Sequence, residues 1–378
     1  MAIKYLAGDR LIGTTAERTA LTTSSTSNPA TGWKILGRQT AVQDATDFEV
    51  DFSSLKKENI MVLVNWARTN SINDPKFQLG INGTLDQGDN YRRRMSANSG
   101  TDEAETSVDD CVSKYGTGSG ADCRNFELLN IRNAGNSAEK LGVSTATYSG
   151  DGGTGTNPVF VENAFKYVHS TASDQIGICA LGDSSTTFQN DSEIVVLGCD
   201  DSEDNSEDSG SNFWQLLGST TYSSGNAMSV SFTAHKYLWI QYHSDTSSGN
   251  GAKLRLNFNN DNSTGDYTQN YENNFGGSSP DSNSPSIYAY TSGNDEWLSN
   301  QFGDIFVVDI DGREKPIIWN ATDVGGQDGV SGTDVFPELR KGAGKYNETG
   351  RITSVQFTNQ NVSGGMESRA RVEVWGAN

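Results

Sequence analysis

The chain has 378 residues, of which 34% are hydrophobic, and 41 glycines stand among many Ser, Thr, Asn and Asp residues. Its formal net charge of −20 excludes nucleic acid as a partner of the bulk surface, because nucleic-acid-binding proteins present basic patches. No segment approaches the ~18 consecutive apolar residues of a membrane span. This composition favours many short strands joined by polar loops.

Residues 1–31 are predicted to form an arm, because they have no counterpart elsewhere in the chain. The arm has too few large apolar residues to fold alone, and those it has would otherwise lie in water. We expect it to dock on an adjacent subunit or on the neighbouring domain. The expected anchors are Ile3, Tyr5, Leu6, Leu11 and Ile12.

Two patterns predict strands in the rest of the chain. Residues 47–52 and 228–232 alternate apolar and polar side chains, which is typical of half-buried strands. Residues 60–64 and 305–310 are continuous apolar runs rich in β-branched side chains, which favours strands covered on both faces over helix fragments. No segment has a helical period over ten or more residues.

The chain contains an internal duplication. Four short motifs recur in the same order: 33–37 (WKILG) as 214–218 (WQLLG), 76–82 (KFQLGIN) as 253–259 (KLRLNFN), 139–140 (EK) as 314–315 (EK), and 193–198 (EIVVLG) as 371–376 (RVEVWG). This period is too long for a solenoid, whose units run ~20–50 residues. Each copy must therefore bury a core of its own.

We predict an all-β protein with two tandem antiparallel β-sandwich domains of the jelly-roll type, at residues 32–200 and 212–378. Each copy contains about eight predicted strands, for which the jelly roll and the immunoglobulin-like fold are the competing sandwiches. The jelly roll is preferred, because an immunoglobulin-like domain has ~100 residues and this unit is longer and lacks the Cys…Trp…Cys spacing.

Residues 201–211 form an acidic connector between the copies. Self-repulsion of its carboxylates would keep it extended as a linker. Calcium binding is the alternative, since hard cations take clustered carboxylates, but the spacing is not that of a helix–loop–helix calcium loop.

All four cysteines lie in the first copy and lack the C-x-x-C spacing of zinc sites. Short loop closure favours the local pairs Cys111–Cys123 and Cys179–Cys199, formed in an oxidising setting. Four reduced thiols in a cytosolic protein are the alternative.

The first copy also has a basic triplet, Arg92, Arg93 and Arg94, whose counterpart in the second copy is Thr268-Gln269-Asn270. It is interpreted either as an intersubunit contact to an acidic neighbour or as a solvated charge run on a loop.

Catalytic motifs are missing from the sequence. The histidines His169, His235 and His243 form no H-E-x-x-H pair, and a straight strand would separate the last two by more than ~20 Å. There is no nucleophile elbow, Walker-type loop or dinucleotide fingerprint. We expect no enzymatic activity, no catalytic residue, no metal and no other cofactor.

The ordered motifs, together with the opening residues 3–10 (IKYLAGDR) and 13–18 (GTTAER), resemble a repeat found in virion structural proteins of uncultured marine phages and archaeal viruses. The resemblance covers nearly the whole chain, and the long inserts of the first copy depart from it. It implies a capsid or decoration protein that self-assembles with identical subunits. Other virion proteins are further candidate partners. The start of the chain lacks a signal-peptide pattern, so synthesis in the host cytoplasm and release within the virion are expected.

An extracellular adhesin or carbohydrate-binding protein is the alternative function. Sandwich loops of such proteins carry exposed aromatics, and Tyr288, Tyr290 and Trp297 in a Ser/Asn-rich stretch are the candidates for glycan binding. Packing of these side chains under a long loop is the competing interpretation.

Overall fold

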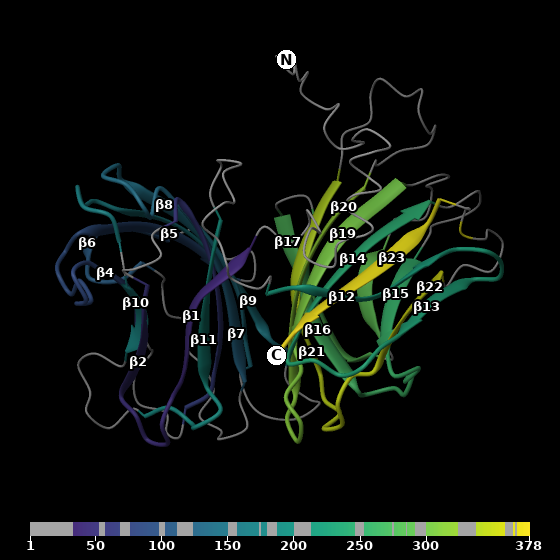
Figure 1. Ribbon diagram of the computed structural model, residues 1–378. Helices are drawn as coiled ribbons and strands as arrows, with labels where there is room; N and C mark the ends of the chain where they lie inside the picture. The colour runs from purple at the N-terminus through teal and green to yellow at the C-terminus, as the bar shows by residue number, and fades with distance from the viewer. Residues whose placement is uncertain are drawn as a thin grey trace, which may run out of the picture.

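The described residues form four antiparallel β-sheets, two for each copy (Figure 1). The computed structural model describes residues 33–52, 57–68, 76–97, 103–111, 124–149, 157–173, 175–179, 187–199, 213–245, 253–273, 276–284, 286–291, 300–323, 338–359, 366 and 369–378. Within these ranges there is no helix, and hence none long and apolar enough to cross a membrane. This agrees with the sequence, in which no segment has a helical period over ten or more residues.

The first copy packs an eight-stranded sheet on a three-stranded sheet. Their strand orders are β1-β11-β3-β7-β8-β9-β5-β6 and β2-β10-β4. The strands are β1 (Lys34–Thr40), β2 (Asp47–Asp51), β3 (Asn59–Trp66), β4 (Lys76–Gly80), β5 (Tyr91–Ala97), β6 (Glu103–Val108), β7 (Asn125–Arg132), β8 (Lys140–Tyr148), β9 (Val159–Tyr167), β10 (Gln175–Cys179) and β11 (Glu193–Cys199).

The second copy packs an eight-stranded sheet on a four-stranded sheet. Their strand orders are β12-β23-β14-β19-β20-β21-β16-β17 and β13-β22-β15-β18. The strands are β12 (Gln215–Thr221), β13 (Ala227–Ser231), β14 (Tyr237–Asp245), β15 (Lys253–Phe258), β16 (Tyr267–Asn273), β17 (Gly276–Ser284), β18 (Ile287–Thr291), β19 (Asn300–Val308), β20 (Lys315–Asp323), β21 (Glu338–Tyr346), β22 (Ser354–Asn359) and β23 (Arg371–Ala377).

The winding of the second copy is that of a jelly roll. Eight strands form two facing groups, β12-β23-β14-β19 and β13-β22-β15-β18, in which the last two strands return between the first ones. The large sheet is then lengthened by β20 and β21, inserted before β22, and by β16 and β17, inserted before β18. The first copy repeats this order, with β8, β9, β5 and β6 as the added strands, except that its described residues include no counterpart of β18.

The predicted pair of β-sandwiches with one topology is therefore confirmed, whereas the count of about eight strands per copy is too low. The added strands escaped the pattern because some carry no apolar alternation. β6 is exposed along almost its whole length, so burial does not impose a period on its sequence, and β17 has the sequence GGSSPDSNS, which contains no large apolar residue.

The Leu-Gly and Gly motifs of the repeat are explained by close packing at the edge of each large sheet. β1 has a bulge before Gly37, where a Cβ would lie 2.4 Å from Val50 Cγ1. At Gly198 on β11, a Cβ would lie 2.7 Å from Leu36 Cδ1. The second copy repeats the bulge and both contacts, with Gly218 against Val230 and Gly376 against Leu217. A larger side chain at Gly37 or Gly218 would push the two sheets of a sandwich apart, and one at Gly198 or Gly376 would displace Leu36 or Leu217 on the neighbouring strand.

The Glu-Lys motif places a fully buried lysine at the start of β8 and again at the start of β20. Lys140 Nζ donates to the carbonyl oxygens of Asn136, Ala138, His169 and Thr171, at 2.6–3.1 Å. Lys315 Nζ likewise donates to the carbonyls of Ile310, Arg313, Glu348 and Thr349. Burial lowers the pKa of both ammonium groups. Four backbone acceptors compensate each ammonium for its lost hydration and tie the loop at that end of the sandwich to the sheet.

A stacked tyrosine pair lies beside each buried lysine. The rings of Tyr91 and Tyr167 are 4.7 Å apart, as are those of Tyr267 and Tyr346. Tyr91 Oη accepts the N–H of Leu79 at 2.9 Å, and Tyr267 Oη accepts that of Phe258 at 2.8 Å. Leu79 thus corresponds to Phe258.

The letter match of residues 76–82 to 253–259 is therefore wrong by two positions, because it aligns Leu79 with Leu256. Its error has a physical cause. A shift of two residues leaves the same side chains facing the core, so the apolar alternation alone does not fix the register of this strand.

Candidate functional site

The two large sheets pack against each other through their outer faces, the faces turned away from the small sheet of the same copy (Figure 1). All eight residues of β3 are buried, because its second face is covered by the second copy. The predicted double burial of 60–64 and 305–310 is thereby confirmed. The shared core comprises Met61, Leu63, Phe126, Leu128, Val195 and Leu197 of the first copy, and Phe213, Trp214, Tyr237, Phe306, Val308, Ile318, Trp375 and Ala377 of the second.

Aromatic side chains of the second copy dominate this contact. Trp239 stacks on Phe306 with ring centroids 5.6 Å apart, and Trp214 meets the edge of Trp239 at 5.7 Å. The motif residues Trp33 and Trp214 both lie at this contact, Trp33 partly buried and Trp214 fully. The repeat motif therefore marks the joint between the copies as well as the core of each.

Glu193, at the start of β11, is a polar anchor of the same contact. Its buried carboxylate accepts Tyr237 Oη at 2.6 Å and pairs with Lys236 Nζ at 2.7 Å, both from the second copy, and with Arg38 from its own. Burial acts to raise the pKa of Glu193, but Lys236, Tyr237 and Arg38 outweigh it and hold that pKa below the ordinary value. Arg38 also donates to the carbonyl oxygen of Asn378 at 2.7 Å.

Two further ion pairs join the copies. Lys341 on β21 pairs with Glu162 on β9 and lies 5.8 Å from the ring centroid of Phe160. Arg313 Nε lies 3.4 Å from Asp191 Oδ2. Apolar burial across a sheet face, closed by charged groups around it, is the anatomy of a stable interface. The two sandwiches thus form one block of four sheets.

The basic triplet is split by the two-residue period of β5. Tyr91, Met95 and Ala97 point into the core, so Arg93 shares their inward face, where it pairs with Asp110 and Glu105. Arg92 and Arg94 point to the outer face. The interpretation as a loop is corrected, because these residues lie within a strand. An intersubunit role stays a prediction for Arg92 and Arg94.

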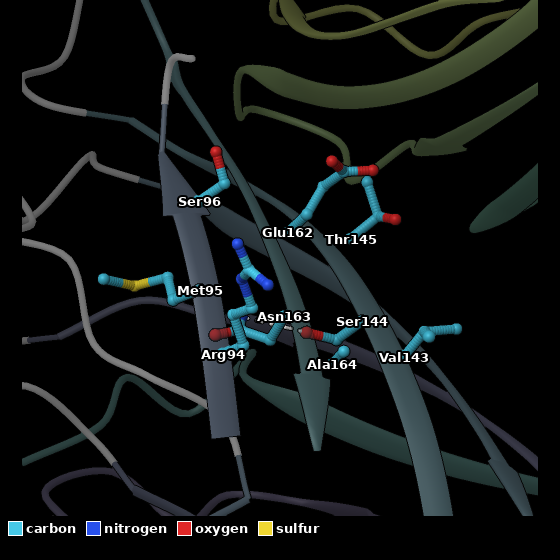
Figure 2. Close-up of a pocket in the computed structure, with 9 residues that line it drawn as sticks. All are labelled: Arg94, Met95, Ser96, Val143, Ser144, Thr145, Glu162, Asn163 and Ala164. Carbon is cyan, nitrogen blue, oxygen red and sulfur yellow. Dashed lines mark hydrogen bonds between the residues drawn. The ribbon is translucent and has the colours of Figure 1, made fainter. Parts of the chain in front are cut away.

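A hollow of about 390 Å³ lies on this outer face, beside the contact with the second copy (Figure 2). Its lining residues come from β5, β8 and β9 and include Arg94, Val143, Thr145 and Glu162. Val143 in this lining and Leu141 beyond it have exposed fractions of 54% and 51%, which are large for apolar side chains.

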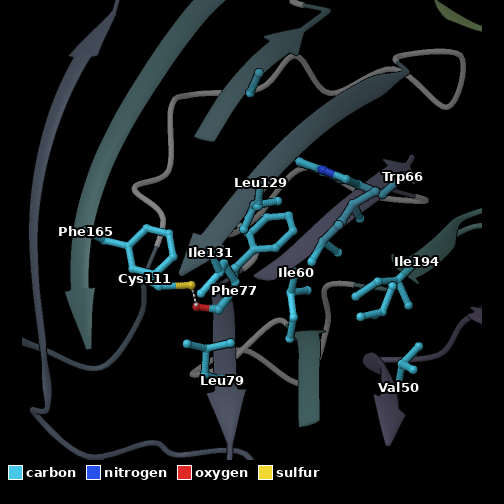
Figure 3. Close-up of a cluster of buried hydrophobic side chains, with 14 of the residues drawn as sticks. Val50, Ile60, Trp66, Phe77, Leu79, Cys111, Leu129, Ile131, Phe165 and Ile194 are labelled. Atoms are coloured by element: carbon cyan, nitrogen blue, oxygen red, sulfur yellow. Dashed lines mark hydrogen bonds between the residues drawn. The ribbon is translucent and has the colours of Figure 1, made fainter. Parts of the chain in front are cut away.

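Cys111 is a core residue of the first copy (Figure 3). Its Sγ lies 3.1 Å from the carbonyl oxygen of Phe77, and its N–H donates to the same oxygen. Cys123 lies outside the described residues, so the Cys111–Cys123 disulfide stays a prediction.

The register of the first copy does not support the predicted Cys179–Cys199 disulfide. Cys179 pairs with Asp47, at the end of the sheets where Thr40 pairs with Glu193. Cys199 is the opposite end of β11, about 20 Å from Glu193 at ~3.3 Å per residue. A disulfide needs Cα atoms within ~7 Å. The prediction failed because short sequence separation does not imply proximity. β11 carries the chain from the end of the sandwich near Cys179 to the opposite end at Cys199.

The remaining candidates are only partly described. The arm residues Ile3, Tyr5, Leu6, Leu11 and Ile12, the connector 201–211 and Trp297 lie outside the described residues, as do the side chains of Tyr288 and Tyr290. The backbone of these two tyrosines belongs to β18, at the edge of the four-stranded sheet. Glycan binding by them stays a prediction.

Glu127 is a buried acid that sequence reasoning missed. It lies on the inward face of β7 with no exposed surface and accepts Tyr148 Oη at 3.2 Å. Burial raises its pKa to about 8, and the hydroxyls of Ser144 and Tyr148 lower it by less. A single carboxyl in a strand gives no sequence signal, because the direction of its side chain depends on the register.

Three carboxylates come together at one end of the second copy. The ligand atoms of Asp261, Asp266 and Glu348 lie within 4.8 Å of one another, a spacing that could hold a cation. Burial and the Asp261 carboxylate raise the pKa of Asp266. The connector 201–211, interpreted as a linker with calcium binding as the alternative, lies outside the described residues. His169 stacks on Tyr167, while His235 and His243 lie before and within β14.

No family model and no curated protein matches the chain. Among solved structures, it is matched to domains LG4–5 of the mouse laminin α1 chain, with 10% sequence identity over 91% of this chain and 90% of that chain. The TM-score is 0.15, so the backbones do not superpose.

Proposed function

We propose that the chain is a non-enzymatic virion structural protein, a shell or decoration subunit that assembles with identical copies. The observation that carries the proposal is the face-to-face burial of the two large sheets, which joins two jelly rolls into one block. Viral capsids use jelly rolls as tiles, and a tile needs a fixed shape so that identical contacts recur around it.

The physical argument concerns rigidity. Two domains held only by a connector would move relative to each other, whereas a desolvated apolar face of this composition resembles an obligate interface. Glu193, Lys341 and Arg313 then fix the register of one sandwich on the other. The block leaves its two small sheets and its sheet edges facing outward, where neighbouring subunits would meet them.

The test is electron microscopy of the purified full chain over a range of salt and protein concentrations, with the variant lacking residues 2–20 beside it. The proposal expects regular shells or lattices for the full chain and folded but unassembled blocks for the deletion, with unchanged circular dichroism. Monodisperse particles that assemble under no condition and bind glycans on an array would overturn it in favour of the carbohydrate-binding alternative.

A further inference from the structure

The outer face of the first copy carries a basic patch in a chain whose formal charge is −20. Across four neighbouring strands, Arg92 pairs in register with Lys166, Lys166 with Leu141, and Leu141 with Arg132. Arg94 and Val143 occupy the next row on the same face. The basic face is defined here as Arg92, Arg94, Arg132 and Lys166 around Leu141 and Val143.

This face is open to solvent. Arg94 and Arg132 are exposed, Arg92 and Lys166 are partly exposed, and the two apolar side chains at its centre are more than half exposed. The hollow of about 390 Å³ adjoins them, with Arg94 and Val143 among its lining residues (Figure 2). The corresponding residues of the second copy are all buried: Thr268, Asn270, Val308, Lys345, Pro316 and Ile318.

An acidic face lies on the opposite side of the same sandwich. Phe48 and Val50 of β2 point into the core, so Asp47, Glu49 and Asp51 point outward from the small sheet, and all three are exposed. Val42, in the turn before β2, is 74% exposed. The second copy has Ala227, Ser229 and Ser231 at these strand positions, so the acidic face belongs to the first copy alone.

The two faces match in spacing and chemistry. Residues two apart on a strand are about 6.6 Å apart, so Asp47 and Glu49 have the same separation as Arg92 and Arg94. Val42 offers one apolar side chain, and the basic face offers apolar Leu141 and Val143 beside a hollow. Opposite charges steer encounter and fix register, and a central apolar contact excludes water.

We propose that the basic face of one copy of this chain binds the acidic face of the next. The inference rests on the proposed function and adds the surfaces through which subunits meet. Because the two faces look in opposite directions from one sandwich, the contact is heterologous, and repetition gives a row or lattice rather than a closed dimer.

The test is sedimentation velocity of the full chain at low and high salt. Wild type is expected to associate with increasing concentration, and less at high salt. The variants Arg92→Glu/Arg94→Glu and Asp47→Lys/Glu49→Lys should each weaken association on the order of ten-fold or more, because like charges then face each other. A mixture of these two variants should recover association, because the unaltered face of each variant meets the unaltered face of the other and the two reversed faces also carry opposite charges.

The control is Ser229→Lys/Ser231→Lys, which adds two cations to the matching strand of the second copy and should leave association unchanged. Assembly that persists in both charge-reversed variants would overturn this contact while leaving the shell proposal standing. A wild type that never associates would refute both this contact and the shell proposal. Binding of a sulfated polysaccharide by the basic face, without self-association, would assign that face to a different partner and refute the inference.

Discussion

Replacement of Glu127 by Gln should stabilise the first sandwich, and by more as the pH rises. The carboxyl of Glu127 is buried on β7, where the hydroxyls of Ser144 and Tyr148 donate to it and no cation among the described residues is paired with it. Burial raises its pKa to about 8 from the ordinary 4.5. Glutamine keeps the shape of the side chain and removes its ionisation.

The magnitude follows from the difference between 8 and 4.5. Below pH 4.5 the carboxyl is protonated in both the folded and the unfolded chain, and its ionisation does not separate them. Between pH 4.5 and 8 the unfolded chain releases the proton and the folded chain keeps it, so the free energy of unfolding falls with rising pH. At ~1.4 kcal/mol per pH unit, the loss by pH 8 is about 5 kcal/mol, or about 3 kcal/mol at pH 7.

The assay is urea denaturation of wild type and Glu127→Gln at pH 5, 6, 7, 8 and 9. The advantage of the variant should grow across this range and level off above pH 8. Exposed Glu103 on β6 supplies the control, since Glu103→Gln removes the same charge from the sheet without removing a buried ionisation. A difference between Glu127→Gln and wild type that stays constant from pH 5 to 9 would refute the reasoning.

Three other changes test the contact between the two copies, the hydrogen bonds of the two buried lysines, and the arm. Glu193→Ala should lower the free energy of unfolding by about 3 kcal/mol, because Lys236 and Tyr237 lose their buried partner. Since the folded pKa of Glu193 is below 4.5, this difference from wild type should be full above pH 4.5 and shrink in acid, as urea titrations would detect. Lys140→Met and Lys315→Met should each lower the free energy of unfolding by about 3 kcal/mol, because each leaves four buried carbonyls without a donor. Thermal denaturation measures this loss, and an unchanged melting temperature would contradict the role given to these lysines. Deletion of residues 2–20 should abolish assembly seen by electron microscopy while circular dichroism is unchanged.

The sequence predicts the scaffold well because the same constraints act in both copies. Gly37, Gly198 and Lys140 each have a counterpart in the same contact, so the repeat motifs mark positions where only one residue type fits. The apolar runs also predicted strands buried on both faces. What covered the second face was not predictable, because a run of apolar residues carries no information on its partner.

The errors share one cause. A two-residue hydrophobic pattern shows neither the register of a strand against its neighbour nor how deeply a given side chain is buried. Arg93 turned inward to Asp110 while its neighbours face outward, and Cys179 and Cys199 fell at opposite ends of the sandwich. Glu127 is buried although nothing in its sequence context shows which face of β7 it occupies. Each outcome depends on how one strand slides against the next, which the hydrophobic pattern fixes only to within two residues.

The contact between the copies also explains why divergence of the two halves is useful. Glu162 and Lys341 occupy equivalent positions. Each lies five residues before the tyrosine that pairs in register with the buried lysine of its own copy. They pair with each other across the joint. If both sandwiches were identical, the same packing would bring two carboxylates or two ammonium groups together, a repulsion that partly buried surroundings would strengthen. A symmetric dimer of either copy would lack this ion pair. Fusion of two diverged copies in one chain therefore allows a charge complementarity that self-association of one domain could not supply.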